Sequence, residues 1–435
     1  MRTEIFDKYF NGLDEVNVYR MSGKVIRIIG LIIESSGPES SIGDLCIIYR
    51  KKKLNPVPAE VVGFSDGKTL LMALHGMEGI SPGCEVRSSN RPLTVKAGEE
   101  MLGRVLDGLG NPMDGKSFLN CKDSIVLNNP APEALSRDRI DKKFITGIKA
   151  IDGMITCAQG QRVGIFSGSG VGKSVLMGMI AKGGEADVNV IALIGERGRE
   201  VKEFIERDLG EEGLKKSVVV TVTSDKEALL RVKGALLATS IAEYFRDKGK
   251  NVLFMMDSCT RYAMALREIG LAVGEPPTTK GYTPSVFNFL PKLLERTGKS
   301  DRGSITALYT VLVEGDDMND PVGDTVRSII DGHIVLSRKI AAKNHYPAID
   351  VLESVSRLFN EVVDSEHKKN QYKIKELMAI YRENEDIINI GAYTKGANPK
   401  IDQAIAKIDK INQFLRQDID EIFSFDQTMK LMSLI

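Results

Sequence analysis

The sequence predicts an α/β protein core with a small β-barrel before it and a helical domain after it. Three observations support this prediction. Short β-branched runs separated by turn residues fill residues 23–97, strands alternate with helix-length segments over 98–357, and apolar positions recur at helical spacing over 358–435. The chain has 435 residues, enough for about three domains that each bury a core.

Residues 1–22 precede the barrel and place Phe6, Phe10 and Leu13 on one helical face. We expect a short amphipathic helix here, which either packs on its own domain or docks to a partner. The expected barrel strands follow at close intervals, with Gly, Pro, Ser and Asp turns between them. They are residues 24–34, 46–49, 59–64, 69–73 and 93–97.

The core and the C-terminal domain differ in pattern. The core alternates apolar strands with helical segments, which predicts a parallel sheet with helices on both faces. Its expected strands are residues 162–166, 188–194, 217–223, 251–256 and 305–313. Beyond Leu358 the chain is charged and poor in Gly and Pro, and residues 373–385 and 401–414 predict helices of a bundle.

Composition narrows the function classes. Lys plus Arg equals Asp plus Glu at 59 each, so the net charge of zero indicates no polyanion-binding surface and no nucleic-acid partner. The five cysteines are scattered without metal-ligand spacing, which indicates free thiols in a reducing compartment. The first residues lack a signal-peptide core and no apolar run reaches about 18 residues. We therefore expect a soluble, cytoplasmic protein.

Residues 167–174 carry the strongest functional signal. They read Ser-Gly-Ser-Gly-Val-Gly-Lys-Ser between an apolar run and a helix-permissive segment. Glycines let backbone N–H groups approach an oligophosphate, lysine reaches the terminal phosphates, and a serine hydroxyl can bind Mg²⁺. The segment predicts the P-loop of a nucleotide triphosphatase, although the strict pattern begins with Gly. The expected nucleotide-binding residues here are Ser167, Gly168, Ser169, Gly170, Val171, Gly172, Lys173, Ser174 and Val175.

Two further carboxylates follow strands of the predicted sheet. The apolar run Val252–Met256 ends in Asp257, which we expect to position Mg²⁺ together with Ser174. Glu196 follows the strand 188–194, at the sheet edge where parallel α/β sheets bind ligands, and is the candidate general base. Taken alone, the charged run around Glu196 would more often be a solvated turn.

Three other residues have open roles on sequence alone. Arg261 follows Asp257 by four positions and either forms an ion pair in the site or packs at a helix start. Tyr346, before Pro347, could stack on a base, and Arg357 could stabilise phosphate charge across a subunit boundary. Unaided, such residues are more often core and surface positions.

Together these stretches resemble the rotary-type ATPases, relatives of the ATP synthase catalytic β subunit. The shared order is a small barrel, a P-loop sheet with Gly-Glu-Arg, a Tyr-Pro-Ala-x-Asp to Ser-x-Ser-Arg stretch and a helical end. Residues 257–287, which contain Gly-Glu-Pro-Pro-Thr-Thr-Lys-Gly-Tyr, and residues 290–298 resemble the type III protein-export ATPases of flagella and injectisomes. The flagellar branch is favoured over the injectisome branch.

The resemblance implies a RecA-like core and a role for each matched residue. Lys173 and Ser174 would bind phosphates and Mg²⁺, Glu196 would activate water, and Asp257 would lie near the metal through a water. Tyr346 would lie against adenine, and Arg357 would enter a neighbouring subunit's site as an arginine finger. Arg197, beside Glu196, is a further catalytic candidate. A site completed in trans implies an oligomeric ring, expected to be a hexamer.

The resemblance also implies partners. The chain would hydrolyse ATP to drive or prime export of flagellar proteins and to release them from chaperones, peripherally at the inner-membrane export apparatus. Expected partners are a stator-like regulatory protein at the N-terminal segment, a central-stalk-like export protein, chaperone–substrate complexes and the membrane export gate.

Four alternatives remain beside this reading. They are an injectisome ATPase, an ATP synthase catalytic subunit, a non-catalytic nucleotide-binding ring subunit and an RNA-translocating ring helicase. The export-type segment speaks against the synthase subunit, and retention of Lys173 and Glu196 speaks against loss of catalysis. The net charge of zero speaks against an RNA translocase.

Overall fold

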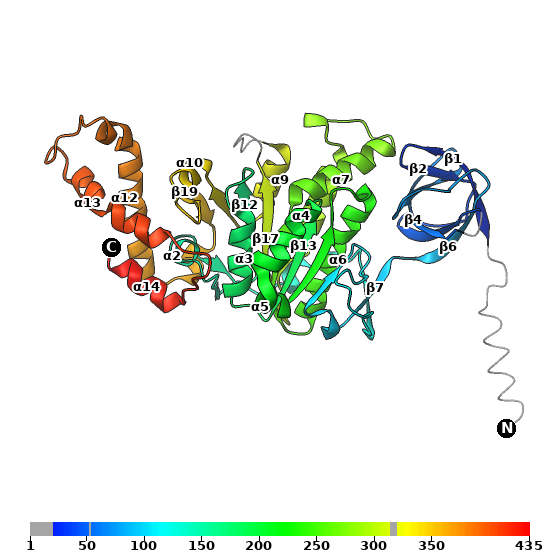
Figure 1. Ribbon diagram of the computed structural model, residues 1–435, viewed down its shortest axis with the longest axis horizontal. Coiled ribbons are helices and arrows are strands. Elements are labelled where there is room, and N and C mark those ends of the chain that lie inside the picture. The colour runs from blue at the N-terminus through cyan, green and yellow to red at the C-terminus, as the bar shows by residue number, and fades with distance from the viewer. Residues whose placement is uncertain (1–20, 52–53, 314–319) are drawn as a thin grey trace, which may run out of the picture. The chain divides into compact units, whose positions relative to one another are not determined.

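The computed structural model describes residues 21–51, 54–313 and 320–435, so the expected helix around Phe6, Phe10 and Leu13 lies outside the described residues (Figure 1). The described chain divides into two compact units. One contains the residues up to Leu93 together with Leu271–Glu275, and the other contains Thr94–Gly270 and Pro276–Ile435.

The first unit is a closed antiparallel barrel of six strands in the order β1-β2-β5-β4-β3-β6. Alternate side chains of these strands fill its core, among them Val25, Ile33, Ile48 and Leu71. The strands are β1 (Ser22–Ile29), β2 (Ile32–Ser35), β3 (Asp44–Tyr49), β4 (Val57–Ser65), β5 (Lys68–Ala73) and β6 (Glu85–Pro92).

Two strand expectations for the barrel were wrong in detail. Residues 24–34 form two strands, because the chain turns at Gly30, whose φ of 56° favours glycine. Residues 93–97 form no barrel strand; β7 (Thr94–Ala97) pairs with β9 (Asp123–Val126) in a separate two-stranded sheet. The sixth barrel strand is β6, whose polar sequence gives no alternating apolar signal.

The second unit is built on a mixed sheet in the order β19-β18-β12-β17-β15-β13-β14-β8. Its neighbouring strands are parallel except for β19, which is antiparallel to β18, and a short strand, β16 (Gly298–Lys299), that pairs antiparallel with β17. The strands are β8 (Arg104–Leu106), β12 (Arg162–Ser167), β13 (Val188–Ile194), β14 (Ser217–Val222), β15 (Asn251–Asp257), β17 (Ser304–Leu312), β18 (Gly332–Leu336) and β19 (Ile349–Ser356).

Helices cover both faces of this sheet (Figure 1). Strands β13 and β14 are buried along their whole length, as expected for strands covered on two sides. Helix α6 (Ala228–Asp247) packs on β13, β14 and β15, and α3 (Lys173–Gly183) packs on the π-helical turn η3 (Phe204–Leu209). The other helices of this sheet are α2 (Lys149–Met154), α4 (Gly198–Glu203), α5 (Gly210–Lys215), α7 (Cys259–Ala272), α8 (Pro284–Leu294), α9 (Pro321–Ile329) and α10 (Arg338–Ala342).

The chain ends in helices α11 (Phe359–Val362), α12 (Ser365–Asn389), α13 (Pro399–Leu415) and α14 (Phe425–Ser433). Three buried polar side chains join this helical part to the segment around α2. His367 bonds to the carbonyl of Gly153 at 2.7 Å, Gln371 donates to the carbonyl of Met154 at 3.0 Å, and Gln417 donates to that of Gly147 at 2.8 Å. Within the described ranges, no helix has the length and apolarity to cross a bilayer. The predicted fold class is confirmed.

Candidate active site

The P-loop joins the end of β12 to the start of α3, as the sequence predicts. Gly170 and Gly172 have φ angles of 78° and 88°, a region in which a side chain is strained. Gly172 is the N-cap of α3, so Lys173 and Ser174 begin the helix. The free N–H groups of a helix N-terminus bind anions, and this loop therefore presents a phosphate site.

Two side chains from the α10 region lie against this loop. The Arg338 guanidinium lies so close to Gly168 that a Cβ at that position would be 2.6 Å from its Nη2. Tyr346 approaches the other end of the loop, where a Cβ on Gly172 would be 3.6 Å from two carbons of its ring. The Tyr346 side chain is 44% exposed and can receive a ligand on its open face. The structure thus brings Tyr346 to the P-loop.

Lys173 meets two carboxylates at the ends of neighbouring strands. Its Nζ forms an ion pair with Oδ1 of Asp257, and it lies 3.8 Å from Oε1 of Glu196. The hydroxyl of Thr310, on β17, donates a 2.7 Å hydrogen bond to the same Asp257 oxygen. Because β13, β15 and β17 are parallel neighbours, their carboxyl ends place these groups at one sheet edge.

The Glu196 side chain is 13% exposed, and its Oε1 is buried and lacks a hydrogen-bond partner among the described residues. Burial, the negative charge of Asp257 and the neighbouring Glu200 together raise the pKa of Glu196 to about 7, against the opposing positive charge of Lys173. A carboxyl group with a pKa near neutrality can hold and release a proton under working conditions. Glu196 therefore has the ionisation expected of a general base.

The two arginines near Glu196 differ in position. The Arg261 side chain, on α7, packs so tightly on Gly195 that a Cβ there would lie 2.9 Å from the Cβ of Arg261. Its Nε is buried without a hydrogen-bond partner among the described residues, and its Nη1 lies 3.9 Å from Sδ of Met264 on the same helix. Arg197 is 78% exposed and lies 3.7 Å from Glu200. The structure does not bring Arg197 to Lys173 or Asp257.

Arg357 and the P-loop of the same subunit lie at opposite ends of the strands of the sheet. Arg357 lies near the start of β12, and the P-loop follows the end of β12. The backbone N–H of Arg357 donates to the carbonyl of Asp331 at 2.9 Å, and Asp331 pairs with Arg162 at the start of β12. The P-loop begins at the other end of that strand, at Ser167. At about 3.3 Å per residue, the strand separates the two ends by about 16 Å.

Comparisons with known proteins identify the family of the chain. Residues 147–356 match the nucleotide-binding domain of the ATP synthase alpha/beta family, and residues 25–90 match its beta-barrel domain. Residues 363–433 match the T3SS EscN ATPase C-terminal domain. The chain is 55% identical to the flagellum-specific ATP synthase of Bacillus subtilis, over 94% of each chain. This chain belongs to the type III export ATPases of the ATP synthase alpha/beta family.

Relatives of this export ATPase come from both flagella and secretion systems. It is 48% identical to the type 3 secretion system ATPase of Xanthomonas euvesicatoria, over 96% of this chain and 95% of that one. The assembled ATPase EscN from the enteropathogenic E. coli type III secretion system superposes with a TM-score of 0.90 at 46% identity, covering 95% of this chain and 99% of that one.

The export ATPase is thus an ATP-hydrolysing enzyme. Sequence reasoning missed two residues of its site, Thr310 and Arg338. Thr310 lies inside the strand 305–313, where only the pairing of β15 with β17 reveals that it faces Asp257. Arg338 follows β18, a strand that the pattern did not indicate.

Proposed function

We propose that this export ATPase hydrolyses MgATP in a homo-oligomeric ring, expected to be a hexamer, in which each active site is completed by the neighbouring subunit. One observation carries the proposal. Lys173, Glu196 and Asp257 converge at the carboxyl ends of the parallel strands, whereas Arg357 lies at the other end of the same sheet. A finger that cannot reach its own P-loop can serve only the site of another copy.

The oxygen groups beside Lys173 suit Mg²⁺. The Asp257 carboxylate lies at the sheet edge, and the Ser174 hydroxyl belongs to the first turn of α3. Carboxylate and hydroxyl oxygens, completed by waters and phosphates, are the ligands that Mg²⁺ prefers. The ion would neutralise charge that develops on the transferred phosphoryl group.

The protein groups then have separate tasks. Residues 167–175 hold the phosphates, with Lys173 on the terminal ones, and Tyr346 packs on the base. The ionised Glu196 accepts a proton from the attacking water, and Arg357 of the neighbouring copy stabilises the transition state. Arg197, which is exposed, would act only if the assembled ring turns it toward the site.

The cellular role follows from the relatives. One solved relative is EscN in complex with its central stalk EscO, with a TM-score of 0.88 at 46% identity. We infer that this chain also assembles around a stalk protein and works peripherally at an inner-membrane export gate. Further expected partners are chaperone–substrate complexes and a stator-like protein that binds residues 1–22. Flagellar export is favoured over an injectisome, since the relative from Bacillus subtilis is flagellum-specific.

The catalytic assignment can be tested with two substitutions. Lys173→Ala should abolish Mg²⁺-dependent phosphate release and weaken ATP binding, because it removes the phosphate-binding cation. Arg357→Ala should lower kcat by about 10³-fold or more while ATP affinity changes little, because a finger acts on the transition state. Phosphate release and nucleotide titration of the purified chain measure both effects. Undiminished hydrolysis in Lys173→Ala, or a parallel loss of affinity and rate in Arg357→Ala, would contradict the proposal.

A further inference from the structure

Gln161, the residue before β12, is fully buried and uses its side-chain amide to join three segments. Its Oε1 accepts from the backbone N–H of Ala158 at 2.8 Å. Its Nε2 donates to the carbonyl of Asp331 at 2.8 Å and to the hydroxyl of Ser356 at 3.2 Å. Ser356 immediately precedes Arg357, and its hydroxyl also donates to the carbonyl of Thr156 at 2.9 Å, so this amide is bonded to the side chain next to Arg357.

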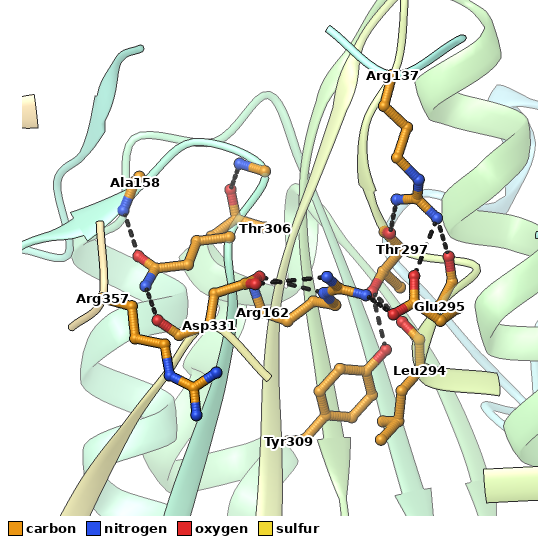
Figure 2. Close-up of polar contacts among 12 residues, drawn as sticks. Arg137, Ala158, Arg162, Leu294, Glu295, Thr297, Thr306, Tyr309, Asp331 and Arg357 are labelled. Carbon is orange, nitrogen blue, oxygen red and sulfur yellow. Dashed lines mark hydrogen bonds and ion pairs between the residues drawn. The ribbon is translucent and has the colours of Figure 1, made fainter. Parts of the chain in front are cut away.

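Asp331 completes the same network. Its carbonyl accepts both from Gln161 and from the backbone N–H of Arg357 at 2.9 Å. Its carboxylate accepts from Nε of Arg162 at 3.1 Å, and the other side of that guanidinium lies 2.5 Å from Glu295. Figure 2 shows this chain of contacts from Asp331 through Arg162 to Glu295.

The Arg357 side chain itself is left available. Within residues 21–51, 54–313 and 320–435, no carboxylate forms an ion pair with it, and its Nη2 makes one long bond of 3.3 Å to the carbonyl of Arg327. Its backbone is therefore fixed by buried groups, while its exposed guanidinium lies apart from the Arg162–Asp331 ion pair (Figure 2). An arginine with a fixed backbone and an exposed guanidinium is suited to contact the transition state in a neighbouring subunit.

We propose that Gln161, together with the Arg162–Asp331 ion pair, acts as a positioning element for Arg357, setting the direction in which the finger enters the neighbouring subunit's site. The inference rests on the proposed trans role of Arg357. Gln161 and Asp331 touch no nucleotide of their own subunit, because they lie at the sheet edge opposite to the P-loop. Their effect therefore appears only in the site of the next subunit.

Three substitutions test this element at increasing mildness. Gln161→Leu removes all three amide bonds, Asp331→Asn keeps the backbone acceptor but removes the charge opposite Arg162, and Ser356→Ala removes one hydroxyl. We expect Gln161→Leu to lower kcat by about 10- to 100-fold, since small displacements of a catalytic group cost rates of this order. The KM for ATP, ATP affinity and ring assembly should stay within about 3-fold. Ser356→Ala should show the same split with a smaller loss.

A matched control is Gln371→Leu. Gln371, in the helical domain, also has a buried side-chain amide, which donates to the carbonyl of Met154 at the end of α2. Its replacement removes a buried amide and its hydrogen bond to Met154 without contact to Ser356 or Asp331. We expect this variant to keep the wild-type kcat.

Mixed rings separate positioning in trans from damage in cis. Gln161→Leu subunits have an intact P-loop and a misplaced finger, whereas Lys173→Ala subunits have an intact finger and a disabled P-loop. When equal amounts are mixed before assembly, about a quarter of the sites combine a working P-loop with a working finger from the neighbour. Activity should rise toward that fraction of the wild-type rate. Mixtures of Arg357→Ala with Lys173→Ala should recover in the same way.

The outcomes distinguish two failures. If Arg357→Ala alone retains full hydrolysis, the trans finger is wrong and the positioning inference falls with it. If Arg357→Ala is inactive and is rescued in mixed rings, while Gln161→Leu and Ser356→Ala are both fully active, only the positioning inference is overturned. Lack of rescue of Gln161→Leu by Lys173→Ala subunits, with rescue of Arg357→Ala, also overturns it.

Discussion

Among the residues of the site, Glu196 combines burial, an unpartnered oxygen and a raised pKa. Its pKa of about 7 means that at pH 6 about nine-tenths of the enzyme carries a protonated Glu196, which cannot accept a proton from water. The kcat/KM of the wild-type enzyme for MgATP, which reports the pKa of the free enzyme, should therefore fall about 10-fold per pH unit below pH 7 and level off above it.

Glu196→Gln should lower kcat by about 10² to 10⁴-fold, because it removes the base and keeps the shape. The residual rate should lose the pH dependence between pH 5 and 8. Phosphate release across this range, with subsaturating and saturating MgATP, measures both effects. A Glu196→Gln enzyme with the wild-type pH profile would show that another group supplies the base.

The same pKa predicts that stability falls as pH rises, whereas activity rises. The ordinary pKa of a glutamate is 4.5, so between about pH 4.5 and 7 the folded chain binds a proton that the unfolded chain releases. Ionisation of Glu196 therefore destabilises the fold as pH rises through this range, by about 1–3 kcal/mol at completion. Without nucleotide, Glu196→Gln should raise the unfolding free energy at pH 8 and lose that advantage below pH 4.5, as denaturant titrations would measure. A Glu196→Gln variant that is less stable than the wild-type enzyme at pH 8 would contradict the view that ionised Glu196 destabilises the folded chain.

At the scale of elements, the P-loop depends on how closely α3 approaches η3. Gly178, inside α3, faces the backbone of Asp208, and a Cβ there would lie 2.6 Å from its carbonyl oxygen. Gly178→Ala must push the two elements apart, which typically costs about 1–3 kcal/mol. We expect a lower unfolding free energy and a weaker ATP affinity, because Lys173 and Ser174 begin the displaced helix.

Gly323, in α9, is a matched control for this prediction. A Cβ at Gly323 would meet its nearest neighbour at 3.7 Å, an ordinary contact. Gly323→Ala should leave stability unchanged or raise it by up to about 1 kcal/mol, since alanine favours helix over glycine. If both variants lose the same stability, the contact of α3 with η3 is not the cause.

The elements also explain which parts of the site the sequence could predict. Gly-Lys-Ser lies in a strand–loop–helix context, and Asp257 and Glu196 follow strongly apolar strands, so local pattern made all three candidates. For Glu196, the charged run alone favoured a solvated turn, and the resemblance was needed to favour a general base. The bond from Thr310 to Asp257 depends on a neighbour in the sheet that is 53 residues away in sequence. Strand order in a parallel sheet is long-range information that no local period carries. The polar β6 was missed for the opposite reason, because barrel closure rather than apolar alternation makes it a strand.

At the scale of the whole molecule, one subunit brings Lys173, Glu196 and Asp257 together at the P-loop and carries Arg357 at the other end of the sheet. In the proposed function, a single subunit binds the nucleotide and a second copy is needed for the full rate. This division also explains why the sequence alone offered the trans role of Arg357 as one possibility beside a surface position, and why the family resemblance was needed to favour it. Its surroundings in Ser-Val-Ser-Arg have no local chemical signature.

The specific activity should consequently depend on protein concentration. At concentrations too low for assembly, the rate per subunit should be low, and it should rise and then saturate as rings form, in parallel with the oligomer fraction. Phosphate release and sedimentation velocity on the same samples, from nanomolar to micromolar protein, measure the two curves. Arg357→Ala should assemble along the same sedimentation curve while its rate per subunit stays flat, because assembly then brings no finger to the site. A wild-type rate that is already maximal where sedimentation shows only monomers would mean that a single chain holds the whole catalytic apparatus.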